Sequence, residues 1–175
     1  MGCVATVYNQ CCPCNPSTGV GQQKSDGVCN IFRLTETEWM HAGDRSFAVT
    51  PVSMGNPHAV LFCDDIFSLD IDDIGGRLTQ HPAFPEGANI GFCQVVDRQF
   101  VRLRVFERGT GETQACGSGA CGAVVAARLL DKVDERVKVS LPGGKLRIKW
   151  PDTNSPVTMA GEASYVYRGE LQLDQ

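Results

Sequence analysis

The sequence has no long apolar run, and its 175 residues carry a formal net charge of only -4. A helix that crosses a bilayer needs about 20 consecutive, mostly apolar residues, so we predict no membrane-spanning segment and no membrane partner. The start of the chain lacks the basic and apolar regions of a secretory signal, which favours a cytoplasmic protein. Acidic and basic residues are interspersed without a basic stripe, so nucleic acid is not an expected partner.

The chain has nine cysteines, an odd number that does not suit the disulfide framework of a small secreted protein. Reduced thiols in a reducing compartment fit this number better. Cys11 and Cys14 have the spacing of half a zinc site, but a structural zinc ion needs four ligands and only Cys29 lies nearby. We therefore expect no metal site.

The composition of the chain changes near residue 30. Before that point, prolines, glycines and cysteines follow one another without a helical or strand period. We expect residues 1–43 to form a poorly ordered, cysteine-rich arm of unknown role. Residues 44–175 are long enough for one domain with its own hydrophobic core.

Short strands dominate this second region. Apolar patterning and turn residues predict strands at 47–53, 58–63, 90–96, 101–105, 137–141, 146–150, 157–160 and 165–173. Residues 70–80 are predicted to form a helix, because Ile71, Ile74 and Leu78 share one face and aspartates lie at its positive N-terminal end.

A second helix is predicted at 117–130, and it has almost no polar face. Most of its residues are alanine, valine, glycine or cysteine. A helix that is apolar nearly all round must be buried, so we place it inside a curved or closed sheet. The predicted class is α+β, with a β-rich shell or barrel around one central buried helix.

Cys116 lies directly before this helix, in a segment with three glycines among residues 117–122. The unpaired N–H groups of a helix start attract anions, and their partial positive charge lowers the pKa of a thiol placed there. We interpret Cys116 as a reactive thiolate. The alternative is a small buried hydrophobe beside glycines that allow close packing, and for Cys121 we adopt that interpretation.

Polar residues near this segment are harder to interpret from position alone. Glu107 and Arg108, at the end of a predicted strand, could hold a zwitterionic amino acid by charge-assisted hydrogen bonds, but an ordinary surface pair fits equally well. Asn56 and Asn89 lie in predicted loops, where turn formation is the simpler role for an amide side chain.

Four segments together resemble the diaminopimelate epimerase family in their order and approximate spacing. They are Ser-Met-Gly-Asn-Pro-His at 53–58, Asn-Ile-Gly-Phe at 89–92, Glu-Arg-Gly-Thr-Gly-Glu-Thr at 107–113 and Ala-Cys-Gly-Ser-Gly-Ala-Cys at 115–121. The resemblance covers residues 47–173 and implies the C-terminal lobe of a two-lobed isomerase, each lobe a β-shell around a helix. It implies interconversion of LL- and meso-diaminopimelate in lysine biosynthesis without pyridoxal phosphate or another cofactor.

The resemblance also implies a role for each residue of these segments. Cys116 would be one of two cysteines that act on opposite faces of the substrate α-carbon, assisted by His58 and Glu107. The amides of Gly117 and Ser118 would bind the α-carboxylate and stabilise the charge that develops on deprotonation. The remaining substrate contacts would come from Asn56, Asn89, Glu107 and Arg108.

The chain departs from the family in one respect that concerns activity. The family's second cysteine lies in a Cys-Gly-Asn-Gly segment, which this sequence does not contain. We therefore expect little or no epimerase activity from this chain alone, unless a separate N-terminal lobe or a homodimer partner completes the site. The alternatives are a related proline-racemase-like isomerase, and a non-catalytic remnant or binding domain of a truncated gene.

Overall fold

The computed structural model describes residues 2–7, 37–170 and 172. The strands in these residues are β1 Gly2–Val7, β2 Glu38–Ala42, β3 Arg45–Ser53, β4 Pro57–Phe62, β5 Asn89–Asp97, β6 Phe100–Glu107, β7 Gly111–Thr113, β8 Arg136–Leu141, β9 Gly144–Lys149 and β10 Val157–Glu162. The helices are α2 Ile71–Thr79 and α3 Gly117–Leu129.

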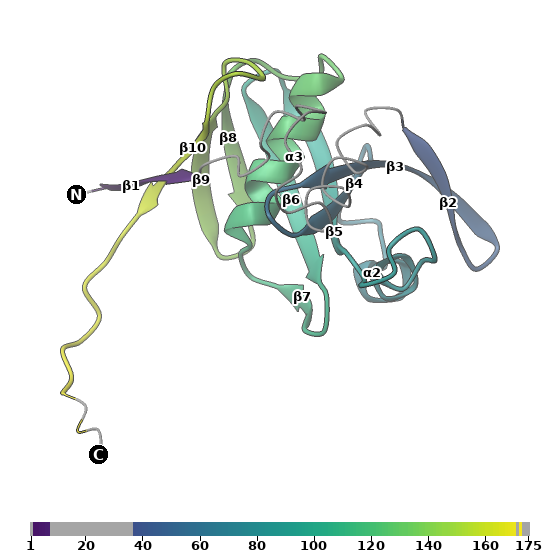
Figure 1. Ribbon diagram of the computed structural model, residues 1–175, viewed down its shortest axis with the longest axis horizontal. Coiled ribbons are helices and arrows are strands. Elements are labelled where there is room, and N and C mark those ends of the chain that lie inside the picture. Colours follow the sequence, from purple (N-terminus) through teal and green to yellow (C-terminus); the bar gives the residue numbers. More distant parts are fainter. Residues whose placement is uncertain (1, 8–36, 171, 173–175) are drawn as a thin grey trace, which may run out of the picture.

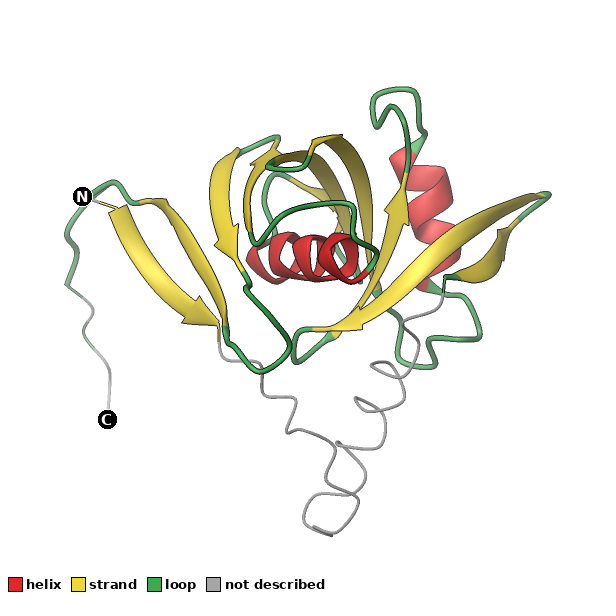
Figure 2. Cartoon of the chain, turned by 90° about the horizontal axis from the view of Figure 1, so that it is seen from above, coloured by secondary structure: helices red, strands yellow, loops and turns green. Residues whose placement is uncertain are grey.

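All of these strands belong to one mixed sheet (Figure 1). Its order is β1-β10-β9-β8-β6-β5-β4-β3-β2, and β7 pairs with β6 beside this path. Two pairs, β4 with β5 and β6 with β8, are parallel. The strands bend around α3 (Figure 2), while β1 and β2 form the two ends of the described order.

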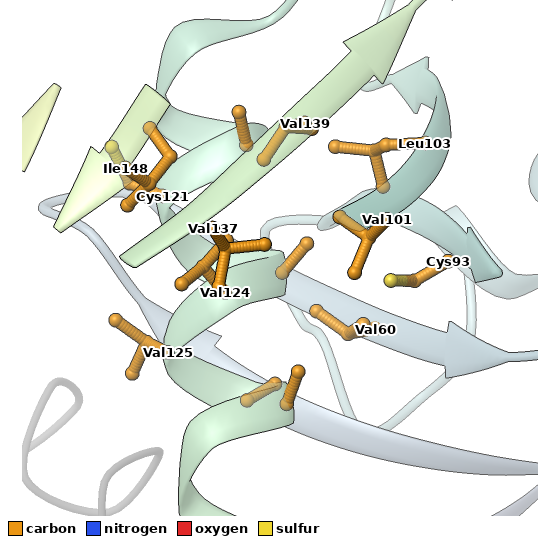
Figure 3. Close-up of a cluster of buried hydrophobic side chains, with 14 of the residues drawn as sticks. Val60, Cys93, Val101, Leu103, Cys121, Val124, Val125, Val137, Val139 and Ile148 are labelled. Atoms are coloured by element: carbon orange, nitrogen blue, oxygen red, sulfur yellow. The ribbon is translucent and has the colours of Figure 1, made fainter. Parts of the chain in front are cut away.

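The helix α3 is buried because it has no polar face to present to water. Every residue from Gly119 to Ala127 is buried, and the helix contacts β3, β4, β5, β6, β9 and β10. Branched side chains from the strands pack against it (Figure 3). The prediction of a strand-dominated α+β protein is confirmed, and closure of the sheet into a barrel around α3 stays a prediction.

The helix α2 covers the opposite face of the sheet. Its residues Ile71, Ile74 and Leu78 form a second buried cluster with side chains of β3, β4 and β5. Along β4, Val60 faces the α3 cluster while Ala59 and Leu61 face the α2 cluster. Burial on both faces explains why residues 59–62 of this strand are apolar in succession rather than alternating.

Both predicted helices form close to the expected bounds. Asp70 caps α2, since its side chain accepts a hydrogen bond from the backbone N–H of Asp73 at 3.1 Å. The prediction of a strand at 165–173 is wrong for residues 165–170, which have no regular structure and pair with none of the described strands, while residues 171 and 173 lie outside the described part of the chain. Tyr165, Val166 and Tyr167 are each at least 80% exposed. A strand needs a partner for its backbone, which residue preferences cannot supply.

The expected boundary between arm and domain falls inside a hairpin. β2 and β3 pair from Glu38 opposite Val49 to Ala42 opposite Arg45, so β2 is part of the sheet. β1 also lies within residues 1–43, and it pairs with β10. Cys11, Cys14 and Cys29, considered above for zinc, lie outside the described residues. Within the described ranges, no cluster of three metal-binding side chains occurs and no helix is long and apolar enough to cross a membrane.

Strand pairing concentrates charge that is interspersed in the sequence. In the β8–β9 hairpin, Arg136 lies opposite Lys149 and Lys138 lies opposite Arg147, and all four side chains are exposed. The alternation of each strand turns the intervening apolar residues inward and these basic residues outward. The outer face of the hairpin is therefore strongly basic in a protein of net negative charge.

Two adjacent glycines of α2 give a matched test of its packing. A Cβ at Gly75 would lie 2.6 Å from Cβ of Phe106 on β6, whereas a Cβ at Gly76 would meet nothing closer than 3.9 Å. We expect Gly75→Ala to lower the free energy of unfolding by about 1 to 3 kcal/mol through overpacking. Gly76→Ala should raise it by up to about 1 kcal/mol, since alanine favours a helix. Urea unfolding measures both, and a Gly75→Ala protein as stable as the parent would contradict this packing.

Candidate active site

The strand register brings His58, Asn89 and Glu107 together at adjacent ends of three neighbouring strands. His58 of β4 lies opposite Asn89 of β5 in the parallel pair, so the beginnings of these two strands are adjacent. β5 and β6 are antiparallel, with Ile90 opposite Phe106, which places the end of β6 and Glu107 beside the beginning of β5. Segments that are up to about fifty residues apart in sequence therefore meet at one place.

Cys116 is the N-cap residue of α3. Its backbone is extended, with φ -138° and ψ 109°, and its Sγ accepts a hydrogen bond from the N–H of Gly119 at 3.4 Å. The hydroxyl of Ser118 lies 3.6 Å from the same sulfur. A Cβ at Gly119 would lie 3.2 Å from Sγ of Cys116 and 3.1 Å from Cγ2 of Val105, so glycine lets the helix begin this close to β6.

The thiol of Cys116 does not have the lowered pKa that the sequence predicts. Only 5% of the residue is exposed, and burial raises the pKa of the thiol above its ordinary value. The nearby charge of Glu107 raises it further, while hydrogen bonds from Ser118 and Gly119 lower it. The expectation of a thiolate is wrong for this chain because burial and a carboxylate outweigh the helix start. The sulfur holds its proton at neutral pH and can act as a proton donor.

His58 is buried against α3 and is neutral at pH 7. It is 1% exposed, and burial lowers the pKa of its imidazole to about 4, although the charge of Glu107 acts in the opposite direction. Its Nε2 lies 3.2 Å from Oδ1 of Asn56. An amide oxygen only accepts hydrogen bonds, so Nε2 carries the proton and Nδ1 is the acceptor. A Cβ at Gly122 would lie 3.6 Å from Cγ of His58, so the ring packs closely on the helix.

Glu107 connects the thiol and the imidazole electrostatically. Its charge raises the pKa of both Cys116 and His58, so the carboxylate lies within interaction range of each. Oε1 of Glu107 also accepts a hydrogen bond from the hydroxyl of Thr113 at 2.5 Å. A proton donor, a neutral base and a carboxylate are thus gathered at the start of α3.

Asn89 and Arg108 are engaged with the backbone. Oδ1 of Asn89 accepts a hydrogen bond from the backbone N–H of Arg108 at 2.9 Å, which ties the start of β5 to the end of β6. The guanidinium of Arg108 donates to the carbonyl oxygen of Glu86. Gly87 has φ +73°, and a Cβ there would lie 2.8 Å from Cδ of Arg108. The side chain of Arg108 therefore lies along the loop before β5.

Gly117 and Ser118 form the first turn of α3 and are half-buried. The first hydrogen bond within the helix joins the N–H of Ala120 to the carbonyl of Cys116 at 2.9 Å. The N–H groups of Gly117 and Ser118 precede it and have no partner within the helix. Together with the partial positive charge of the helix start, this arrangement can bind a carboxylate.

Comparison with known families shows which family this chain belongs to. Residues 50–166 match the family model described as diaminopimelate epimerase. The chain belongs to the diaminopimelate epimerase family. The matched range includes every residue of the site described above.

Solved structures show that the fold is shared with racemases and epimerases. A probable proline racemase from Agrobacterium radiobacter K84 is 13% identical, with a TM-score of 0.57 over 79% of this chain and 50% of that one. A hydroxyproline epimerase from Agrobacterium vitis is 13% identical, with a TM-score of 0.55 over 74% of this chain and 47% of that one. A PhzF-family phenazine biosynthesis protein from Enterococcus faecalis is 16% identical, with a TM-score of 0.45 over 55% and 35%. This chain spans half or less of the length of each.

Two features of this diaminopimelate epimerase family member were missed in the sequence. One is the contact of the Thr113 hydroxyl with Glu107, although Gly109 and Gly111 between them are typical of a tight hairpin. The other is a contact of the turn between β8 and β9, in which the N–H of Gly143 donates to the carbonyl of Gln114 at 2.7 Å. This bond braces the segment that leads into Cys116, and no local pattern predicts it.

The effect of the Glu107 charge on the pKa of Cys116 can be tested by alkylation of the thiol. We expect Glu107→Gln to lower the pKa of Cys116, because a nearby negative charge is removed. Alkylation by iodoacetamide at pH 7 should become about 3- to 10-fold faster, because a larger fraction of the thiol is then ionised. The rate is followed by mass spectrometry on the tryptic peptide 109–128. Glu86→Gln removes an exposed charge as a control, and an unchanged rate in Glu107→Gln would refute the coupling.

His58 should make the stability of the domain depend on pH. Its pKa is about 4 when folded and about 6.5 when unfolded, so the unfolded chain binds more protons between these values. The free energy of unfolding should therefore fall as the pH drops from 6.5 to 4, by up to about 3 kcal/mol from this group. Urea unfolding at pH 7.0 and pH 4.5 measures the loss. A His58→Gln protein should lose distinctly less stability over this interval, and an equal loss in both proteins would show that His58 is not buried in its neutral form.

Proposed function

We propose that this chain is the C-terminal half of a cofactor-independent amino-acid epimerase that interconverts LL- and meso-diaminopimelate. One observation carries this proposal. A protonated thiol, a carboxylate and two backbone N–H groups that have no partner within the helix lie together at the start of one buried helix. Membership of the family supports the same chemistry. The pathway would be lysine biosynthesis in the cytoplasm.

The helix start provides the means to stabilise the reaction's charged state. The substrate α-carboxylate binds the N–H groups of Gly117 and Ser118. When the α-proton is removed, negative charge spreads from the α-carbon onto this carboxylate, and the fixed amides and helix dipole stabilise it. Because these donors are held in place before the reaction, their orientation costs little at the transition state.

Cys116 transfers the proton on one face of the α-carbon. In the state described here its Sγ–H gives a proton to the carbanion and becomes a thiolate, and in the reverse direction the thiolate takes that proton back. Glu107 and the neutral imidazole of His58 adjust the proton affinity of the sulfur. Asn56, Asn89, Glu107 and Arg108 complete the proposed substrate contacts.

Inversion needs a second proton-transfer group on the opposite face of the α-carbon, which takes the α-proton when Cys116 gives one and gives one when Cys116 takes the α-proton. The sequence contains no Cys-Gly-Asn-Gly segment, and the chain spans about half the length of the racemase and epimerase that share its fold. We propose that the second thiol comes from an N-terminal lobe on a separate chain, or from a homodimer partner. Without it, the small thiolate fraction of Cys116 can take the α-proton, exchange it with solvent and return a proton to the same face, so the centre is not inverted.

A second candidate substrate is a proline derivative, because the likeness in fold includes a probable proline racemase and a hydroxyproline epimerase. Glu107 and Arg108 favour a substrate with charged groups beyond the α-carbon, as diaminopimelate has. Parallel assays with both substrates separate the two candidates.

The decisive assay follows loss of the α-proton of diaminopimelate in heavy water. We expect slow exchange without inversion from the chain alone, and epimerisation when an N-terminal lobe of the family is supplied. Cys116→Ala should lower either rate by at least about 100-fold, since the group that takes and returns the proton is lost. Cys63→Ser, which alters a half-buried thiol beside β5, serves as the control.

Three outcomes would count against the proposal. Exchange that survives Cys116→Ala would remove this cysteine from the mechanism. Exchange of hydroxyproline in place of diaminopimelate would assign the second substrate class. No exchange of either substrate, even with the supplied lobe, would indicate a non-catalytic domain.

A further inference from the structure

The β6–β7 hairpin places a hydroxyl group against the carboxylate of the proposed site. Thr113 of β7 lies opposite Val105 of β6, and Glu107 lies opposite Gly111. The hydroxyl of Thr113 donates to Oε1 of Glu107 at 2.5 Å, which is the short distance expected of an O–H donor and an ionised acceptor.

We propose that Thr113 is a positioning residue that holds the carboxylate of Glu107 toward Cys116 and His58. A role of Thr113 in catalysis rests on the proposed function, but the hydrogen bond between Thr113 and Glu107 does not depend on the substrate. A glutamate side chain has three rotatable bonds, and fixing them costs conformational entropy. One strong hydrogen bond at the carboxylate offsets that cost and selects one direction for the charge.

The strand β7, which carries the Thr113 hydroxyl, is held in place by an ion pair on its other face. Glu112, the neighbour of Thr113 on β7, forms a two-point ion pair with Arg104, with distances of 2.6 and 2.7 Å. Arg104 also donates to the carbonyl of Ile66 at 3.0 Å. Successive side chains of a strand point to opposite faces, so Glu112 anchors β7 on one face while Thr113 reaches Glu107 on the other.

The bond to Thr113 occupies only part of the capacity of the carboxylate. An ionised carboxylate has about four lone-pair sites, so Glu107 can accept from the Cys116 thiol while it stays bound to Thr113. The charge of Glu107 acts on both the thiol and the imidazole, and the strength of that effect depends on distance. A carboxylate free to rotate would act on both groups less strongly.

The test is a double-mutant cycle in which the measured quantity is the pKa of the Cys116 thiol. The pKa of Cys116 is obtained from the pH dependence of its alkylation in the parent, Glu107→Gln, Thr113→Val and the double variant. Valine keeps the shape and strand preference of threonine but removes the hydroxyl. We expect Glu107→Gln to lower the pKa in the parent, and to lower it by less than half as much in the Thr113→Val background.

Thr113→Ser is the matched control, because serine retains the hydroxyl and should restore the full effect of Glu107→Gln. An equal effect of Glu107→Gln with threonine, serine and valine at position 113 would overturn the proposal. If Thr113→Val does not fold, as judged by urea unfolding, Thr113→Ala replaces it in the same cycle with the same expectation.

This result is independent of the assay with diaminopimelate. A reduced coupling in Thr113→Val together with no α-proton exchange would support the positioning role and refute the proposed function. Where exchange is observed, Thr113→Val should lower its maximal rate more than it changes the substrate concentration at half-maximal rate, and Thr113→Ser should recover it. A change confined to that substrate concentration would show that Thr113 acts in binding instead.

Discussion

The structure depends on the burial of α3, a helix with almost no polar side chain, against the inner face of a bent sheet. Its alanines and glycines let the strands approach closely, and branched residues such as Val101 and Leu103 fill the remaining space. The strand pairing that brings distant segments together is arranged around this helix. The position of the candidate site follows from it, because the site is the place where the helix begins.

The N-cap of this helix is Cys116, so the residue that begins a core element is also the proposed proton-transfer group. The helix start supplies amide donors, yet the same burial that holds the helix removes the thiol from water. The balance leaves the sulfur protonated, and the charge of Glu107 adds to the effect of burial. In the proposed enzyme, the substrate and a second lobe would change this environment, which is how a buried acid could alternate between its two protonation states.

Much of the fold could be predicted from local pattern. The three-to-four-residue period of 70–80, the apolar character of 117–130 and the alternation of 101–105 identify α2, α3 and β6, since each reflects which faces are buried. The pairing of β7 and the absence of a strand at 165–170 could not be predicted, because a strand forms only where a neighbour accepts its backbone hydrogen bonds. The basic face of the β8–β9 hairpin could not be predicted for the same reason, because it arises from the strand register.

By itself, the sequence determined the family, the residue types of the candidate site and the helix on which Cys116 lies, because motifs and periodicity are local properties of a chain. Only the tertiary structure decided the direction of the thiol's pKa, the neutral state of His58 and the hydrogen bond between Thr113 and Glu107. Proton affinities and side-chain contacts depend on burial and on charges brought from distant segments, and these exist only once the chain has folded.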